Sequence, residues 1–264
     1  MFDIGISTAC FYPMYLEKAL ERITKFDISV CEIFFNCFSE LEMSFVKELK
    51  SIADCHGVKV ASVHPFLSGL ESFLFFSPYD RRFGDGLDIY KKMFEAAQYL
   101  GTRYFVLHGA YPASFCGMDE YVRRYNMISD AALQYGIILT HENVSRTVTA
   151  DADFISHMNV ACNSSINYTF DLKQCIRAEN DPLRMIEAMG NKIKNVHIND
   201  FDFAKKECRL PCDGNCDILS VLKKLKETGY DGNLIIEVYS DNYSSDDDIV
   251  NSISKLRELI KSSL

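Results

Sequence analysis

Short apolar runs alternate with longer amphipathic stretches along the whole chain of 264 residues. Several of the runs are rich in β-branched and aromatic residues, which is typical of buried strands. On this pattern we predict eight strands, at Ile4–Ser7, Val30–Phe34, Val58–His64, Tyr104–His108, Ile137–Asn143, Asn167–Asp171, Lys194–Asn199 and Leu234–Tyr239.

Helical spacing of apolar residues fills the segments between these runs. Several of the segments stop just before a glycine, which is a common C-terminal cap of a helix. Asp181-Pro182 also has the composition of a helix start, a capping residue followed by proline. The predicted helices are Tyr15–Lys25, Ser44–His56, Asp88–Leu100, Asp119–Tyr135, Ala152–Asn159, the one that opens at Asp181, Asp217–Thr228 and Ile249–Leu264.

Strict alternation of strand and helix predicts parallel strands joined by crossover helices. A count of eight strands favours a closed barrel over an open doubly wound sheet. No strand is followed by a glycine-rich phosphate loop, which disfavours a dinucleotide-binding fold. We therefore predict a single (β/α)8 TIM barrel that forms one domain over residues 1–264.

Composition narrows the choice of partners. The net charge is −9, with 37 acidic and 28 basic residues, and this disfavours nucleic acid, whose phosphates need a basic surface. The sequence predicts no transmembrane helix and no signal peptide. The ten cysteines are then expected to be reduced thiols in a cytoplasmic protein, mostly core residues.

Potential metal ligands stand at or near the ends of successive predicted strands. They are Glu32, His64, His108, Glu142, Asp171, His197 and Glu237, and from His64 onward neighbours are 26 to 44 positions apart, about one strand–helix unit. In a parallel barrel these ends converge on one mouth, where active sites of this fold are built. Burying this many ionisable groups together costs free energy unless a partner of opposite charge binds among them. Carboxylates with imidazoles suit a divalent ion such as Mn, Mg, Co or Zn.

The same residues carry a resemblance to a known family. The chain resembles the xylose isomerase-like barrels, the sugar phosphate isomerase/epimerase superfamily that includes the type-four apurinic endonucleases. The resemblance rests on GIST at the first strand, Glu32-Ile33, VHPF, VLHG, Glu142-Asn143, Phe170-Asp171, VHIND and the run RLPCDGNCDI…LKETGYDGNLIIE. That last run is the most specific part of the match.

The resemblance implies roles for individual residues. Glu142, Asp171, His197 and Glu237 match the metal ligands of the epimerase branch, in which the two glutamates also exchange protons with the substrate. His64 and His108 match positions that hold a further ion in the endonuclease branch, and they are substrate contacts in many sugar-acting members.

Several positions depart from the family pattern. Gln174 replaces a usual histidine and Cys212 a usual glycine. Lys206 and Cys208 stand where the endonuclease branch needs Asp and His for its third metal. These departures argue against DNA-repair activity.

The sequence therefore predicts a divalent-metal-dependent sugar or sugar phosphate isomerase or epimerase. Glu142 and Glu237 would transfer protons through an enediolate. The predicted substrate contacts are His64, His108, Glu32, Gln174 and Arg209, with a structural ion pair as the alternative for Glu32 and Arg209.

Three other functions stay open on the sequence. A dehydratase or lyase acting on a polyhydroxy ring compound would use the same ligands, and loss of water from the substrate would reveal it. A phosphoesterase related to the endonucleases and a non-catalytic sugar-binding barrel are the others. A homo-oligomer and a thiolate site at Cys208, Cys212 and Cys216 are also left open. His141 has the opposite strand phase from Glu142, so it is predicted to face the helix layer.

Overall fold

Eight parallel strands close into a barrel in the order β1-β10-β7-β6-β5-β4-β3-β2, which confirms the predicted (β/α)8 fold. The computed structural model describes residues 2–162 and 166–263. The strands of the barrel are β1 Asp3–Ser7, β2 Val30–Phe34, β3 Lys59–His64, β4 Tyr104–Leu107, β5 Ile138–Glu142, β6 Asn167–Asp171, β7 Ile193–Ile198 and β10 Asn233–Ile236.

All eight predicted strands are present: β2 and β6 have the predicted bounds, and the ends of the other six differ by at most three residues. The largest difference is at β10, which was predicted to run to Tyr239 and ends at Ile236. The backbone N–H of Glu237 still donates to Ile198 O at 3.3 Å. Glu237 therefore sits where the chain leaves the barrel.

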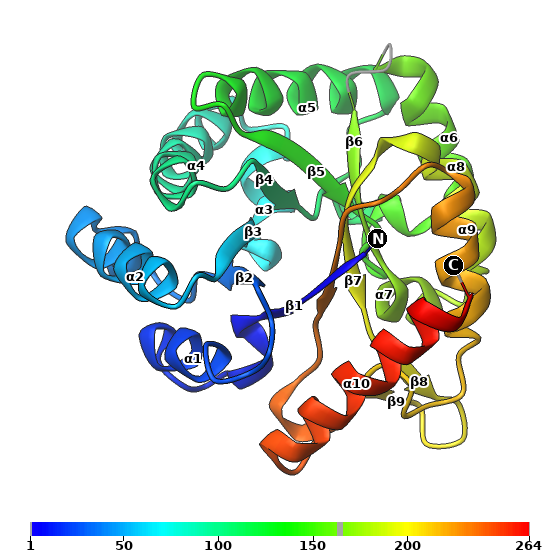
Figure 1. The fold of residues 1–264 in the computed structure, drawn as a ribbon. Helices are drawn as coiled ribbons and strands as arrows, with labels where there is room; N and C mark the ends of the chain where they lie inside the picture. The colour runs from blue at the N-terminus through cyan, green and yellow to red at the C-terminus, as the bar shows by residue number, and fades with distance from the viewer. Residues whose placement is uncertain (1, 163–165, 264) are drawn as a thin grey trace.

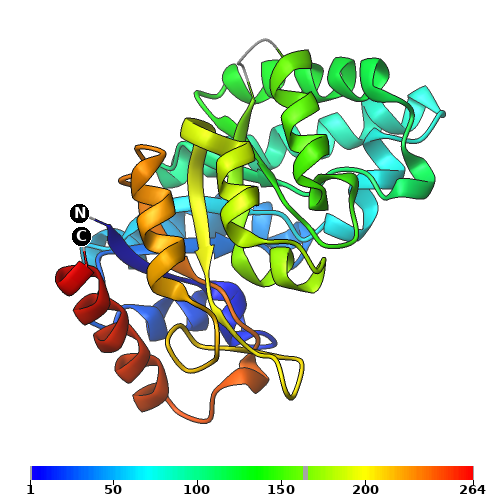
Figure 2. The ribbon, with the colours of Figure 1, turned by 90° about the vertical axis from the view of Figure 1, so that its right-hand side faces the viewer.

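Helices surround the barrel, as Figure 1 shows, and the two ends of the chain lie close together in both views (Figures 1 and 2). Each predicted helix has a counterpart in the structure. The helices are α1 Leu16–Ile23, α2 Met43–Cys55, α3 Ser68–Phe75, α4 Asp80–Leu100, α5 Met118–Leu133, α6 Ala152–Ala161, α7 Leu172–Arg177, α8 Pro182–Met189, α9 Ile218–Glu227 and α10 Asp246–Ser263. Leu264, which was predicted to end the last helix, lies outside the described residues.

Two helical segments near the third strand were not predicted. α3 occupies a segment over which no helix was predicted, and α4 begins at Asp80 rather than Asp88. Gly86 explains the second difference. A Cβ there would lie 2.9 Å from the Phe75 ring, so glycine allows α4 to pack closely on α3. Glycine inside a helix is unfavourable locally, and tertiary packing overrides that preference here.

A small antiparallel hairpin, β8 Asp200–Asp202 with β9 Glu207–Arg209, projects beyond the end of β7 (Figure 2). It precedes the loop in which Cys212 stands in place of the family's usual glycine. Cys212 has a φ of 67°, a left-handed conformation that favours glycine. The glycine of the family pattern therefore matches a real backbone requirement, and cysteine meets it at some cost.

Strand residues alternate between the barrel interior and the helix layer. Ile33, Val63 and Val196 belong to the apolar core. The side chains next to them in sequence point the other way and meet inside the barrel. Ser62 Oγ donates to Glu32 Oε2 at 2.6 Å, and Asn195 Nδ2 lies 3.3 Å from the same oxygen. This buried polar layer lies beneath the strand ends and supports the site built there. No helix of the described residues is both long enough and apolar enough to cross a bilayer.

Candidate metal centre

Four side chains from four neighbouring strands converge at the mouth of the barrel. Glu142 ends β5, Asp171 ends β6, His197 lies near the end of β7, and Glu237 follows β10. Each offers a ligand atom, and these atoms all lie within 4.8 Å of one another. Around His197 Nδ1 are Glu142 Oε1 at 3.3 Å, Glu237 Oε2 at 3.6 Å and Asp171 Oδ2 at 3.7 Å.

The other ring nitrogen of His197 is held by Glu32. Glu32 Oε2 lies 2.9 Å from Nε2, and both side chains are fully buried. A proton on Nε2 that is donated to Glu32 leaves the Nδ1 lone pair directed at the three carboxylates. Carboxylate–histidine pairs of this kind orient the ligands of metal sites.

The electrostatic field at this place favours a cation. Burial would lower the pKa of His197, yet the carboxylates of Glu32 and Glu237 raise it well above its usual range. Burial would raise the pKa of Glu32, but His197 lowers it to about 2. Asp171 Oδ2 is buried and accepts no hydrogen bond from any described residue. The nearest donors, Lys173 Nζ at 3.4 Å and His197 Nδ1 at 3.7 Å, do not complete a hydrogen bond to this oxygen. A buried carboxylate oxygen that accepts no hydrogen bond has room for a ligand bond, so the donor set fits a divalent ion.

A second group of potential metal ligands lies next to the first. His64, His108 and Glu142 also present ligand atoms within 4.8 Å of one another. His108 Nε2 is 3.3 Å from Glu142 Oε2 and 3.1 Å from His64 Nε2. Glu142 therefore belongs to both groups.

Glu71 on α3 positions His108, and sequence reasoning missed this residue because it predicted no helix over α3. Its carboxylate is fully buried and accepts from the backbone N–H of His108 at 2.7 Å and of Gly109 at 3.0 Å. Glu71 Oε1 also lies 3.0 Å from His108 Nδ1 and accepts from the Tyr90 hydroxyl. Burial would lower the pKa of His108, but Glu71 raises it to about 9.

Lys173 on α7 is a further site residue that sequence reasoning missed. Its Nζ donates to Glu237 Oε2 at 2.7 Å and lies 3.4 Å from Asp171 Oδ2. Burial would lower the pKa of Lys173, but Asp171 and Glu237 raise it well above its usual range. A lysine two residues after a predicted ligand at a strand end was the available signal.

These groups open into a cavity of about 460 Å³. That volume suits a small molecule. His64, His108, Glu142 and Glu237 lie at its base together with Lys173, and its wall and rim residues include Tyr12, Phe34, Asn36, Phe66, Tyr111, Arg146, Gln174 and Tyr239. We call it the mouth cavity.

Only some of the predicted substrate contacts line the mouth cavity. His64, His108 and Gln174 line the mouth cavity, whereas Glu32 lies beneath it, bonded to His197. Arg209 lines a different cavity on the hairpin and pairs with Glu207 at 2.7 Å. Glu32 and Arg209 thus each form an ion pair, and neither side chain lines the mouth cavity.

His141 faces the helix layer, as its strand phase predicted. Its Nε2 is 2.6 Å from the Tyr121 hydroxyl, and its ring stacks on Tyr121 and Tyr125 of α5. Nδ1 lies 3.0 Å from Leu107 O. Burial lowers the pKa of His141 to about 4, so the ring is neutral and structural.

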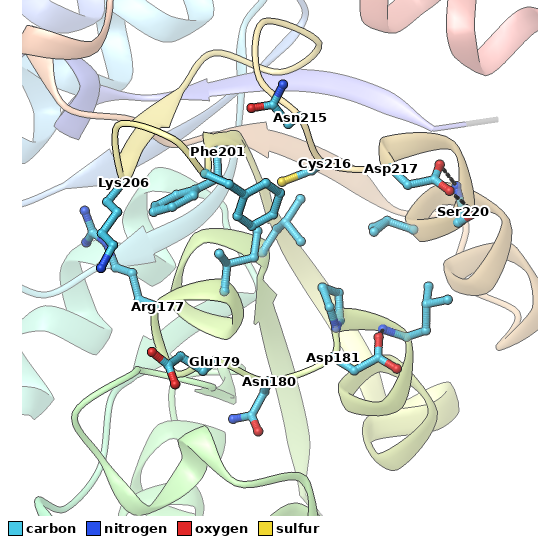
Figure 3. A pocket seen from close by; sticks show the side chains of 16 residues that line it. Arg177, Glu179, Asn180, Asp181, Phe201, Lys206, Asn215, Cys216, Asp217 and Ser220 are labelled. Atoms are coloured by element: carbon cyan, nitrogen blue, oxygen red, sulfur yellow. Dashed lines mark hydrogen bonds between the residues drawn. The ribbon is translucent and has the colours of Figure 1, made fainter.

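A larger cavity of about 730 Å³ lies outside the barrel, between the hairpin and α7, α8 and α9 (Figure 3). Arg177 and Lys206 lie at one end, and Asp181, Asp217 and Ser220 lie toward the other. Cys216 lines it as well. The potential metal-binding groups of the described residues contain none of the cysteines, so no thiolate centre is found among them.

Comparison with known proteins assigns the chain to a family. The family model described as xylose isomerase-like TIM barrel matches residues 20–259. The chain therefore belongs to the xylose isomerase-like TIM barrel family.

Individual relatives are distant. An uncharacterized protein of Methanocaldococcus jannaschii is 25% identical over 247 residues, which cover 88% of this chain and 82% of that protein. Among solved structures, a D-tagatose 3-epimerase-like protein has a TM-score of 0.81 at 22% identity, covering 99% of this chain and 98% of the other. A D-psicose 3-epimerase has a TM-score of 0.80 at 14% identity, covering 98% and 99%. At this identity the structural similarity shows the shared fold alone.

Proposed function

We propose that the protein is a divalent-metal-dependent epimerase or isomerase that acts on a small ketose. The observation that carries the proposal is the cluster of Glu142, Asp171, His197 and Glu237, whose ligand atoms lie within 4.8 Å of one another at the barrel mouth. The epimerases among proteins of similar fold support this choice of reaction.

These four residues would hold the ion, with Glu32 orienting His197 from below. When bound, a divalent ion polarises a carbonyl oxygen and makes the neighbouring C–H more acidic. This is the contribution that the protein's own side chains do not supply.

The two glutamates stand at the ends of a four-strand arc. Glu142 comes from β5 and Glu237 follows β10, with β6 and β7 between them in the barrel. A substrate in the mouth cavity would therefore have a carboxylate on each side. One glutamate removes a proton from carbon, and the other returns a proton to the opposite face or to the adjacent carbon.

Two histidines would orient the substrate. His64 and His108 line the mouth cavity, with their Nε2 atoms 3.1 Å apart. Because Glu71 binds Nδ1 of His108, its Nε2 is directed toward Glu142 and the cavity. Imidazole nitrogens at this place can hydrogen-bond substrate hydroxyls.

The test is to incubate the purified protein with Mn²⁺ and a panel of ketoses in D2O. The expected result is deuterium at the carbon next to the carbonyl, together with the epimeric or isomeric sugar, seen by NMR. EDTA should abolish both. Loss of water from the sugar, seen by mass spectrometry, would indicate a dehydratase instead. Absence of both reactions across the panel with metal bound would contradict the proposal.

A further inference from the structure

The cations of the mouth cavity point to the chemical class of the substrate. Lys173 lies at its base and Arg146 at its rim. The protein has a net charge of −9, so two cationic side chains in the candidate active site call for a functional explanation.

Lys173 is buried, yet its ammonium has a donor to spare. Of its three N–H groups, one donates to Glu237 Oε2 at 2.7 Å, and a second faces Asp171 Oδ2 at 3.4 Å. The side chain also lines the mouth cavity. No described residue accepts a hydrogen bond from the remaining N–H, and Nζ lies 5.1 Å from the centre of the Tyr239 ring, which also lines the cavity. A molecule bound in the cavity could therefore accept from this N–H.

Arg146 is exposed on the loop that follows β5. Its guanidinium forms no ion pair or hydrogen bond with any residue in 2–162 or 166–263, whereas several other arginines pair with acids, as Arg123 does with Glu120. A guanidinium with five free donors suits bidentate binding of a carboxylate or phosphate.

Gln174 brings the two cations to the same side of the mouth. Its Oε1 accepts from the backbone N–H of Ser145 at 3.1 Å and from Ser145 Oγ at 2.9 Å. Ser145 precedes Arg146 and Gln174 follows Lys173, so these hydrogen bonds join the β5 loop to α7. The family's usual histidine is absent from this position, and its place is taken by an amide that fixes the loop.

The charges around the site lead to the same conclusion. Glu142, Asp171 and Glu237 are three carboxylates, and a divalent ion alone would leave one of their charges unbalanced. Lys173 supplies the missing positive charge. Glu32 beneath His197 and the Glu71–His108 pair also carry charge close to the base of the mouth cavity. The attraction for an anionic group therefore comes from the Lys173 ammonium and the Arg146 guanidinium, both of which line the cavity.

We propose that the substrate carries an anionic group, a carboxylate or a phosphate, which binds between Lys173 and Arg146. This inference rests on the proposed function, because it places the group in the same cavity as the reacting carbon. It makes Lys173 and Arg146 the residues that select the substrate.

The test compares three sugars that differ only at C6: D-fructose, D-fructose 6-phosphate and D-fructuronate. Binding to the Mn²⁺-loaded protein is measured by calorimetry, and deuterium exchange is followed in parallel. At least one anionic sugar should bind roughly ten- to a hundred-fold more tightly than D-fructose, the ratio expected from charge-assisted hydrogen bonding. Which of the two binds more tightly distinguishes a phosphate from a carboxylate.

Substitutions test whether Lys173 and Arg146 cause the preference for an anionic sugar. Arg146→Gln, an exposed change that should leave the fold intact, and Lys173→Met should each remove most of the preference. Arg103→Gln and Lys194→Met are the matched controls. They remove the same kinds of charge near the starts of β4 and β7, at the opposite end of the barrel, and should keep the preference for the anionic sugar.

Two outcomes separate this inference from the proposed function. Equal or tighter binding of D-fructose relative to both anions, or a preference that survives Arg146→Gln, would overturn the anionic subsite even if deuterium exchange occurs. Absence of exchange with all three sugars would instead count against the proposed reaction, while the binding ratios still decide on the subsite.

Discussion

At the scale of single residues, the buried carboxylate of Glu71 is the clearest addition to what the sequence indicated. It accepts hydrogen bonds from two backbone N–H groups and contacts His108 Nδ1. A residue that acts through another in this way typically changes activity by about ten- to a hundred-fold when substituted.

Glu71→Gln tests this positioning role. The amide cannot replace the charge beside His108, so kcat should fall about ten-fold or more, and stability should fall by about 1–3 kcal/mol from imperfectly satisfied buried donors. Stopped assays and denaturant melts measure the two effects. Glu95→Gln, an exposed change on α4, is the control. Unchanged kcat in Glu71→Gln would remove Glu71 from the site.

His141 gives a pH dependence of stability. The pKa of its buried ring is about 4 against 6.5 for an ordinary histidine. Above pH 6.5 the ring is neutral in both states, so it adds no pH dependence. Below that value only the unfolded chain takes up the proton, so stability falls as the pH drops toward 4, by up to about 3 kcal/mol. Unfolding free energies of His141→Gln between pH 7 and 4 should decline less steeply than those of the wild type. Parallel curves would refute this.

At the scale of elements, the loop after the β8–β9 hairpin depends on a close backbone approach. Asp200 accepts from the backbone N–H groups of Gly214 and Cys216, each at 2.9 Å. A Cβ on Gly214 would clash with the Asp200 carboxylate and lie 2.7 Å from Phe201 O. The glycine is thus required by packing.

Paired alanine substitutions test that requirement. Gly214→Ala should lower the melting temperature through a loss of about 1–3 kcal/mol. Gly84→Ala, in α4 with no atom within 4 Å of the added Cβ, should instead stabilise the protein by about 0.5–1 kcal/mol. Thermal melts of the two variants should move in opposite directions, and a shift of the same sign in both would contradict this reading of the loop.

Much of the fold could be predicted because alternating hydrophobic patterns mark strands and helices locally. The strand-end residues also identified the cluster, since parallel strands must converge. The sequence did not reveal Glu71, because α3 shows no clear periodic pattern; its Phe75 packs instead on the rings of Phe83 and Tyr90 of α4. For Arg209 the sequence left a substrate contact and a structural ion pair open. It overlooked Lys173, which lies on the unpredicted helix α7. It also overlooked Arg146, because side-chain directions in loops depend on tertiary contacts such as the Ser145–Gln174 hydrogen bonds.

At the scale of the whole molecule, an ion at the mouth would join four strands of the barrel, from β5 to β10. Saturating Mn²⁺ should therefore stabilise the folded state, by about 2.7 kcal/mol at a hundred-fold excess over Kd, and raise the melting temperature by several degrees. EDTA should reverse the shift, and Asp171→Asn should greatly reduce it. An equal shift in Asp171→Asn would indicate that the ion binds elsewhere.

Proton transfer by the two glutamates is measured most directly by solvent deuterium exchange into a reactive ketose with Glu142→Gln and Glu237→Gln, with metal content measured on the same samples. Each variant should lose exchange by about a hundred-fold or more, as expected for removal of a general acid or base, while Glu179→Gln, in the outer cavity, should exchange like the wild type. Full exchange in both glutamine variants would contradict proton transfer by the two glutamates.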